Sequence, residues 1–134
     1  MAIMKGIEYG DASAAVRAVY DDIMAIRKTD WINDFWKVLA NDPVTLARTW
    51  SSIKEVMGPG ALDPLVKELL YIAVSITNNC EYCINSHAAA ARAKGASDAM
   101  LAEVIAVTAM ANETNRLAIG YQVAPDSRFL HPSR

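Results

Sequence analysis

Residues 63–95 read DPLVKELLYIAVSITNNCEYCINSHAAAARAKG, and this segment contains the clearest helix boundaries of the chain. Asp63-Pro64 is a helix start signal, because aspartate accepts backbone N–H bonds and proline fits the first helical turn. The run LVKELLYIAVSIT is rich in β-branched residues, but it is too long for a typical strand and contains no turn residue, so it predicts a helix. Asn78-Asn79 is expected to cap a second helix, which Gly95 closes in a left-handed conformation.

Similar boundary signals lie upstream of this stretch. Residues 11–28, DASAAVRAVYDDIMAIRK, repeat apolar residues at a helical period and predict one amphipathic helix. A short apolar and aromatic piece follows at residues 31–40. Asp42-Pro43 then gives the same start signal for a helix that we expect to continue as far as Gly58-Pro59-Gly60.

Downstream, Ser97-Asp98 begins a further helix. Between Met100 and Ala111 this helix is apolar nearly all round, which in a small domain indicates that another subunit covers one face. We therefore expect a homo-oligomer. Residues from Ala124 onward show no usable periodicity and are interpreted as a tail.

The composition agrees with a small helical protein. The chain has 134 residues and is expected to form one domain, 1–134. Hydrophobic residues make up 53% of it and alanines number 23, which favours helix over sheet because alanine loses no side-chain entropy in a helix. The predicted fold class is all-α, with a bundle of about six helices.

The charge balance and the hydropathy exclude several classes of partner. Thirteen basic residues against fifteen acidic ones provide no cationic field for a phosphate backbone, so we expect no nucleic-acid partner. No uncharged stretch reaches the roughly 20 residues that a membrane-spanning helix needs, so we expect no membrane partner. The N-terminus lacks a signal-peptide pattern and two cysteines make no disulfide scaffold, which together predict a cytoplasmic location.

The candidate chemistry lies in the second helix of the quoted stretch. Cys80, Cys83 and His87 fall within an arc of about 60° on one helical face. Residues three apart in a helix have Cα atoms about 5–6 Å apart, which a disulfide tolerates, so the pair could open and close with little backbone motion. A cap at Asn78 or Asn79 would place both cysteines near the helix N-terminus, where a thiolate is favoured. His87, one turn beyond Cys83, can take the proton of its thiol.

Glu68 lies on the polar stripe of the preceding helix, together with Tyr71 and Ser75. The break between the two helices could fold its carboxylate back over the thiols. A buried glutamate there would orient His87 and hold its charged form. The predicted relay runs from Glu68 through His87 to Cys83.

Each of these residues also has an interpretation without catalysis. The cysteines could be buried small hydrophobes, the histidine a hydrogen-bonded structural residue and the glutamate a solvated helix residue. Zinc bound by all four is the competing chemical interpretation, although structural zinc sites usually pair two short motifs and the only other histidine is His131. The large aromatic residues at helical positions are interpreted as packing residues: Trp31, Trp36, Trp50 and Tyr82.

The spacing of these residues resembles the signature E-x11-C-x2-C-x3-H of the alkylhydroperoxidase D-like group, which belongs to the carboxymuconolactone decarboxylase family. Glu68, the Cys80-Glu81-Tyr82-Cys83 segment and His87 form the match, and the similarity covers about residues 62–111. The resemblance implies an all-α fold with the motif cysteines at the start of a helix. It also implies assembly as a trimer or a hexamer.

The resemblance further implies a thiol-dependent peroxidase or disulfide oxidoreductase, with a role for each residue. Cys83 attacks a hydroperoxide as a thiolate and becomes a sulfenic acid, and Cys80, the resolving thiol, condenses with it to a disulfide. His87 is the general base that deprotonates the attacking thiol, and Glu68 supports the histidine. An external dithiol from an electron-donor protein must then reduce the redox-active Cys80–Cys83 disulfide. No other cofactor and no metal is implied.

Tyr82 stands where some members of the group carry a second histidine between the cysteines. A tyrosine hydroxyl donates a hydrogen bond but is a poor base near neutral pH, so the role of this position in proton transfer is open. The decarboxylase branch generally lacks the paired cysteines, and the pair therefore favours redox chemistry. Two alternatives stay open. One is a non-redox lyase that uses His87 and Glu68 on a small carboxylate, and the other is an oligomer whose thiols act as a redox switch for partner binding.

Overall fold

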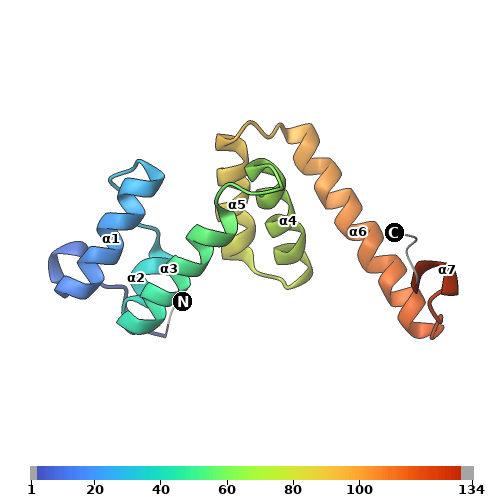
Figure 1. Ribbon diagram of the computed structural model, residues 1–134, viewed down its shortest axis with the longest axis horizontal. Coiled ribbons are helices and arrows are strands. Elements are labelled where there is room, and N and C mark those ends of the chain that lie inside the picture. Colours follow the sequence, from blue (N-terminus) through green and yellow to red (C-terminus); the bar gives the residue numbers. More distant parts are fainter. Residues whose placement is uncertain (1–2, 131–134) are drawn as a thin grey trace. The chain divides into compact units, whose positions relative to one another are not determined.

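The structure is a computed structural model that describes residues 3–130. Within this range it contains seven α-helices, one short 3-10 helix and no strand, which confirms the all-α fold class (Figure 1). The chain divides into two compact units, residues 1–58 and 59–134. That the 134 residues act as one domain stays a prediction.

The first unit contains three α-helices preceded by a single 3-10 turn. The expected start signal at Asp42-Pro43 is confirmed, since the Asp42 side chain accepts hydrogen bonds from Val44 and Thr45 N–H. The first α-helix is capped by the Ser13 side chain, which accepts from Val16 N–H. The elements are η1 (Tyr9–Asp11), α1 (Ala14–Arg27), α2 (Asp34–Leu39) and α3 (Pro43–Met57).

An apolar core with two tryptophans in edge-to-face contact holds the first unit together. Trp36 and Trp50 pack edge to face, with ring centroids 5.6 Å apart, and Trp50 Nε1 donates a 2.7 Å hydrogen bond to Asp22. Both tryptophans are packing residues as expected, but Trp31 is 59% exposed, so that interpretation of Trp31 was wrong. The buried core residues are Ala12, Val16, Tyr20, Ile23, Ile32, Trp36, Ala40, Leu46 and Trp50.

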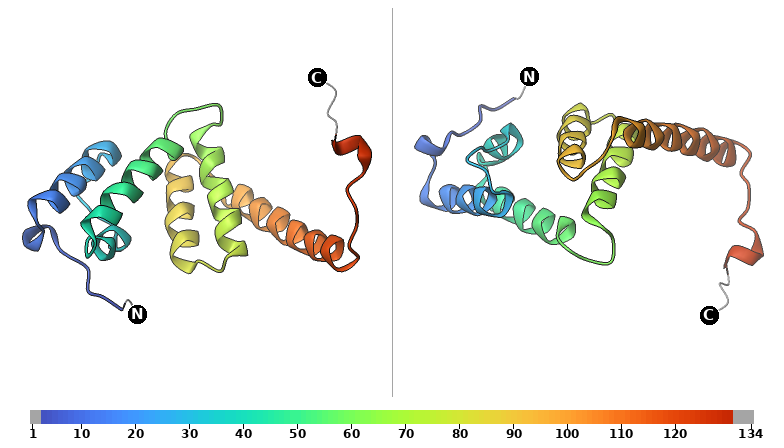
Figure 2. Two further views of the ribbon diagram at one scale, coloured as in Figure 1. Left: turned by 60° about the horizontal axis from the view of Figure 1, so that its bottom comes forward. Right: turned by 90° about the horizontal axis from the view of Figure 1, so that it is seen from above.

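The second unit is built on a pair of neighbouring helices and one long helix. Its first two helices pack against each other, and the third packs on the first of them and extends beyond both (Figure 2). The predicted starts are correct, since the Asp63 side chain accepts from Leu65 N–H and that of Ser97 accepts from Met100 N–H. The elements are α4 (Pro64–Thr77), α5 (Glu81–Ala93), α6 (Asp98–Gly120) and α7 (Ser127–Leu130).

The predicted tail contains a short helix. Residues 127–130 form the single turn α7 within the segment from Ala124 onward that the sequence predicts to be a tail. Four residues are too few to produce the apolar periodicity by which a helix is recognised in sequence. His131 lies outside the described residues.

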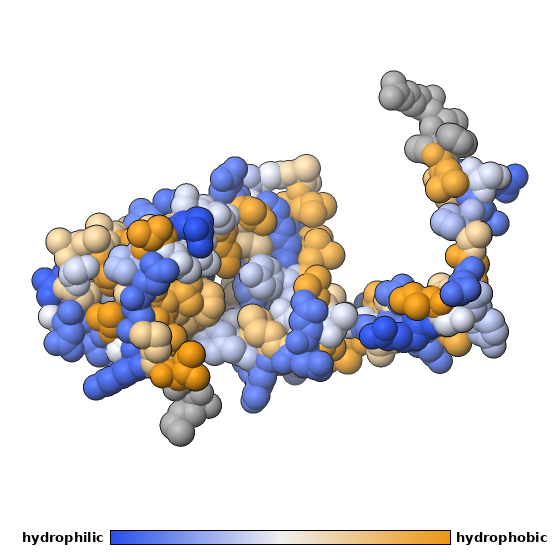
Figure 3. All heavy atoms as spheres, turned by 90° about the horizontal axis from the view of Figure 1, so that it is seen from below, coloured by the Kyte–Doolittle hydropathy of each residue, from blue (hydrophilic) through white to orange (hydrophobic). Residues whose placement is uncertain are grey.

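The second unit has few buried residues compared with the first. Among its described residues only Glu68, Ile72, Ser75, Ala91 and Thr108 are buried. Large apolar side chains of α4 and α6 are instead more than half exposed, and apolar surface is visible along the arm that the end of α6 forms (Figure 3). These are Leu70, Val74, Ile105, Val107, Met110, Leu117 and Ile119.

None of the helices in residues 3–130 combines the length and the apolar character that crossing a bilayer requires.

Candidate functional site

A tight turn between α4 and α5 brings the candidate site residues together. The N–H of Cys80 donates to the carbonyl of Ser75 at 2.9 Å, and the N–H of Asn79 donates to that of Ile76 at 3.2 Å. Asn79 adopts a left-handed conformation with φ of 58°. This is a Schellman motif, which terminates α4 and reverses the chain within two residues.

The cap of α5 differs from the expectation. Cys80 is the N-cap residue, and its Sγ accepts a 3.3 Å hydrogen bond from the N–H of Cys83. Asn78 and Asn79 were expected to cap α5 and instead terminate α4. The physical reason is that the turn requires a left-handed conformation. Asn adopts this conformation more readily than most other residues that have a β-carbon.

Cys80 and Cys83 are joined in a disulfide at the N-terminus of α5. Their Cα atoms lie 5.3 Å apart, within the range that a disulfide bridges without backbone distortion. Both residues are half-buried. The disulfide therefore lies in the first turn of α5, where the helix dipole and backbone N–H groups such as that of Cys83 would favour a thiolate over a thiol.

His87 and Glu68 form a short contact across the α4–α5 interface. His87 Nδ1 lies 2.7 Å from Glu68 Oε2, and the two side chains are 15% and 8% exposed. His87 is one turn beyond Cys83 on the same helix. Since the carboxylate accepts only, Nδ1 carries a proton in this contact, and Nε2 is the ring nitrogen left for proton transfer.

Tyr71 packs flat against the imidazole of His87. The ring centroids are 3.7 Å apart and the planes are inclined by 21°. Tyr71 is on α4, one turn after Glu68. The same helix therefore provides Glu68 at the edge of the imidazole and Tyr71 on its face. The ring of His87 is thereby fixed in orientation by two contacts with different chemistry.

Lys94 is a further partner of Glu68, and sequence reasoning missed it. Its Nζ donates to Glu68 Oε1 at 3.1 Å, so each oxygen of the buried carboxylate has its own partner. Lys94 is the C-cap residue of α5, followed by Gly95 with φ of 103°. The sequence does contain a signal: Lys94 lies seven residues after His87, two helical turns along the same face.

The environment of Glu68 favours its ionised form. Burial raises the pKa of Glu68, but hydrogen bonds from His87 and Lys94 and the positive charges of these groups outweigh burial, so the pKa lies below the ordinary glutamate value. A carboxylate that stays ionised keeps accepting from His87 Nδ1. This arrangement fixes which imidazole nitrogen is available to a proton donor.

Two further residues that the sequence singled out are Ser75 and Tyr82. The buried Ser75 hydroxyl donates to the carbonyl of Tyr71 at 2.6 Å, which is a local bond within α4. Tyr82 is 43% exposed on the first turn of α5, which differs from the packing role expected for it. In residues 3–130 no group of three or more histidine, cysteine or acidic side chains is arranged to hold a metal ion.

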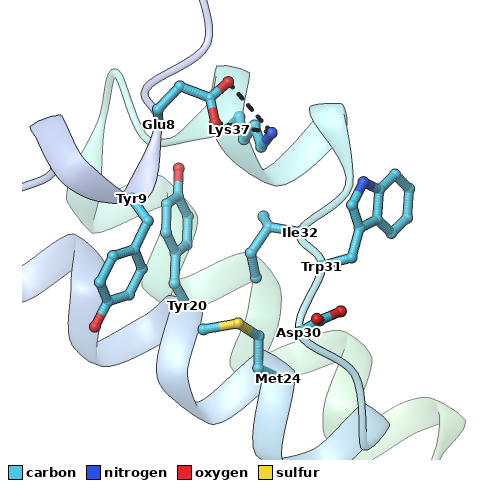
Figure 4. Close-up of a pocket in the computed structure, with 8 residues that line it drawn as sticks. All are labelled: Glu8, Tyr9, Tyr20, Met24, Asp30, Trp31, Ile32 and Lys37. Carbon is cyan, nitrogen blue, oxygen red and sulfur yellow. Dashed lines mark hydrogen bonds and ion pairs between the residues drawn. The ribbon is translucent and has the colours of Figure 1, made fainter.

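A cavity of about 330 Å³ lies in the first unit, remote in sequence from these residues (Figure 4). Its wall includes an ion pair between Lys37 and Glu8 with a nitrogen–oxygen distance of 3.0 Å. The lining contains neither cysteine nor histidine, and it therefore offers no thiol or imidazole chemistry. The lining residues are Glu8, Tyr9, Tyr20, Met24, Asp30, Trp31, Ile32 and Lys37.

Known proteins share both the sequence pattern and the fold of this chain. Residues 45–124, more than half of the chain, match the model of the carboxymuconolactone decarboxylase family. The crystal structure of the alkylhydroperoxidase AhpD core from Rhodospirillum rubrum is 48% identical, covers 98% of each chain and superposes with a TM-score of 0.93.

A curated relative from Paracoccus denitrificans, named uncharacterized protein 4 in cox locus, is 39% identical over 56 residues. That match includes 42% of this chain and spans half the length of the relative. The family match, the fold and the conjunction of a Cys80–Cys83 disulfide with the Glu68–His87 contact lead to one assignment. The chain is an alkylhydroperoxidase D-like member of the carboxymuconolactone decarboxylase family.

Proposed function

We propose that this protein is a thiol-dependent peroxidase that reduces hydroperoxides with Cys83 as the nucleophile and Cys80 as the resolving thiol. The observation that supports it is the redox pair at the start of α5, one turn from an imidazole that the buried Glu68 holds by Nδ1. A buried acid, an oriented base and two adjacent thiols are the parts that thiolate chemistry needs.

The reaction proceeds in two oxidative steps. The Cys83 thiolate attacks one peroxide oxygen, the O–O bond breaks, and sulfenic acid and an alkoxide form; the alkoxide leaves as an alcohol after protonation. The Cys80 thiol then attacks the sulfenic sulfur, which forms the disulfide and releases water. The two electrons that reduce the peroxide come from the two thiols.

His87 and Glu68 manage the protons in this scheme. Nε2 of His87 takes the proton of the Cys83 thiol, and the imidazolium returns a proton to the departing alkoxide. Glu68 is a positioning residue, since it acts through His87 and holds the tautomer with the free Nε2. The variant Y82F tests whether the Tyr82 hydroxyl contributes a hydrogen bond to this proton transfer.

A dithiol from an electron-donor protein completes the cycle. One donor thiolate attacks the Cys80–Cys83 disulfide, and a mixed disulfide forms. The second donor thiol then attacks the donor sulfur of the mixed disulfide, which forms a disulfide in the donor and leaves both cysteines reduced. Such donors are kept reduced in the cytoplasm, which is the compartment that we propose for this protein.

The experiment follows thiol loss after one equivalent of hydrogen peroxide or an organic hydroperoxide is added to the reduced protein, with intact mass measured in parallel. We expect rapid loss of both thiols, reversed by dithiothreitol. C83S should abolish the fast reaction, and C80S should stop at a sulfenic acid on Cys83. Thiols that react no faster than an unactivated cysteine would contradict the proposal.

A non-redox lyase is the second candidate, because the matching family model is that of a decarboxylase family. In this alternative His87 and Glu68 act on a small carboxylate substrate and the thiols are dispensable. The variant with both cysteines replaced by serine separates the two functions. It retains a lyase activity but no peroxidase activity, whereas H87A loses both. A redox switch for partner binding would show a reversible disulfide without turnover.

We also propose that copies of the chain assemble through the apolar surface of α6. Val107 and Met110 are 68% and 58% exposed, and with Ala106, Ala111 and Thr114 they line a shallow groove on this helix. An isolated unit with so much exposed apolar surface would gain free energy by covering it. A second copy of α6 is apolar on the matching face, and a trimer or a hexamer would bury it.

A further inference from the structure

Glu68 is shared between two partners, only one of which belongs to the proposed proton relay. Oε2 contacts His87 Nδ1 at 2.7 Å and Oε1 contacts Lys94 Nζ at 3.1 Å. The carboxylate is on α4 and both partners are on α5, seven residues apart. Because the Glu68 side chain is only 8% exposed, water contributes little to balancing its charge.

We infer that Lys94 is a positioning residue of the proposed peroxidase. It keeps His87 neutral because it compensates the negative charge of Glu68. The inference rests on the proposed function and deepens it, since a base must be unprotonated before it can take a proton from a thiol. Lys94 therefore sets the pH range in which His87 Nε2 is available.

The electrostatic reason is the competition of two positive charges for one carboxylate. With His87 as its sole partner, Glu68 would favour the imidazolium strongly, because the ion pair compensates the buried negative charge. Lys94 already compensates the charge of Glu68, and its own positive charge repels a positive charge on His87. Protonation of His87 then gains less free energy than in a two-residue pair.

The other groups around the imidazole do not supply this effect. Helix α4 contributes Tyr71, which stacks on the ring, in addition to Glu68. Helix α5 contributes the two cysteines, which are joined in the disulfide. Within residues 3–130, the ion pairs and hydrogen bonds of His87, Glu68 and Lys94 include no charged α6 side chain. Lys94 is thus the cation that shares the carboxylate.

Arg92 offers a matched control on the same helix. It lies in the last turn of α5, two residues before Lys94, and pairs with Asp98 at 2.9 Å. The side chains of this pair are 57% and 90% exposed, so water screens its charge. R92M therefore removes one positive charge from the end of α5, as K94M does, but leaves the Glu68 carboxylate untouched.

The test is an NMR titration of the His87 Cε1–H resonance in the oxidised protein. The chain has two histidines, so an H131Q background leaves His87 as the only signal. We expect the titration midpoint in K94M to move to higher pH by about 0.5 to 1 unit, while K94R and R92M stay within about 0.2 unit of the parent. Thermal melting by circular dichroism checks folding, and K94Q replaces K94M if that variant does not fold.

An unchanged or lowered midpoint in K94M, or an equal shift in R92M, would overturn the inference. The titration uses the disulfide form and no peroxide, so it does not depend on the proposed activity. A shifted midpoint in a protein without peroxidase activity would refute the function and leave the Lys94–His87 coupling in place. In an active enzyme, the acidic limb of the rate of thiol loss against pH should move with the NMR midpoint.

Discussion

Glu68 and His87 are nineteen residues apart in the chain, yet Glu68 Oε2 lies 2.7 Å from His87 Nδ1. The contact determines which imidazole nitrogen faces a proton donor, because Nδ1 must carry hydrogen to bond to a carboxylate. Nε2 is then the nitrogen that remains for chemistry. The same carboxylate also accepts from Lys94, so an acid, a base and a cation form one connected group.

Glu68 should make the stability of the protein depend on pH in the acidic range. Its pKa is lowered in the folded state, since the bonds from His87 and Lys94 and their charges outweigh the opposite effect of burial. The unfolded state therefore binds more protons below about pH 4.5, the ordinary glutamate value, and stability is lost as pH falls through the folded-state pKa.

Replacing Glu68 by glutamine should remove this dependence. E68Q is expected to be less stable than the parent by about 1–3 kcal/mol at neutral pH, and the difference should shrink on acidification. Urea unfolding at several pH values and one protein concentration measures it, with E113Q on the exposed surface of α6 as control. A difference between parent and E68Q that stays constant down to pH 3 would refute the assignment to this carboxylate.

The stack of Tyr71 on His87 should affect the reaction through ring orientation rather than through the tyrosine hydroxyl. Y71L is expected to slow peroxide-dependent thiol loss about two- to tenfold, corresponding to the roughly 0.5–1.5 kcal/mol of an aromatic pair. Y71F keeps the stack and should react like the parent. Equal rates in Y71L and Y71F would show that the face contact has no part in the reaction.

The turn at Asn79 should be sensitive to the side chain that must adopt φ of 58°. N79A is expected to lose about 1 kcal/mol of unfolding free energy, because a left-handed conformation is costly for alanine. Glycine has no such cost, so N79G should be at least as stable as the parent. Denaturant unfolding of the two variants decides this, and a stable N79A would argue against strain at the turn.

The apolar surface of α6 should be the contact between copies of the chain. V107E places a charge on a residue that is 68% exposed in the single chain, and we expect it to reduce the oligomer to monomers in analytical ultracentrifugation. R116E introduces the same side chain about 180° around the helix and serves as the control. If V107E sediments like the parent, the assembly uses another surface.

Features that depend on residues close together in the chain can be predicted from the sequence alone. Asp42-Pro43, Asp63-Pro64 and Ser97 start α3, α4 and α6, because caps act within a single helical turn. Cys80 and Cys83 meet for the same reason, since residues three apart are neighbours on any helix. The short helix α7 and the exposure of Trp31 were not predicted, as neither depends on a periodic pattern.

Only the tertiary structure decided how α4 and α5 face each other. The Schellman turn at Asn79 sets the direction of the reversal, and that direction brings Glu68 and Tyr71 onto the edge and face of His87. The end of α5 brings Lys94 to the remaining oxygen of Glu68. A contact across two helices depends on the packing angle and register, to which many residues contribute small amounts of free energy, so no local pattern in the sequence specifies it.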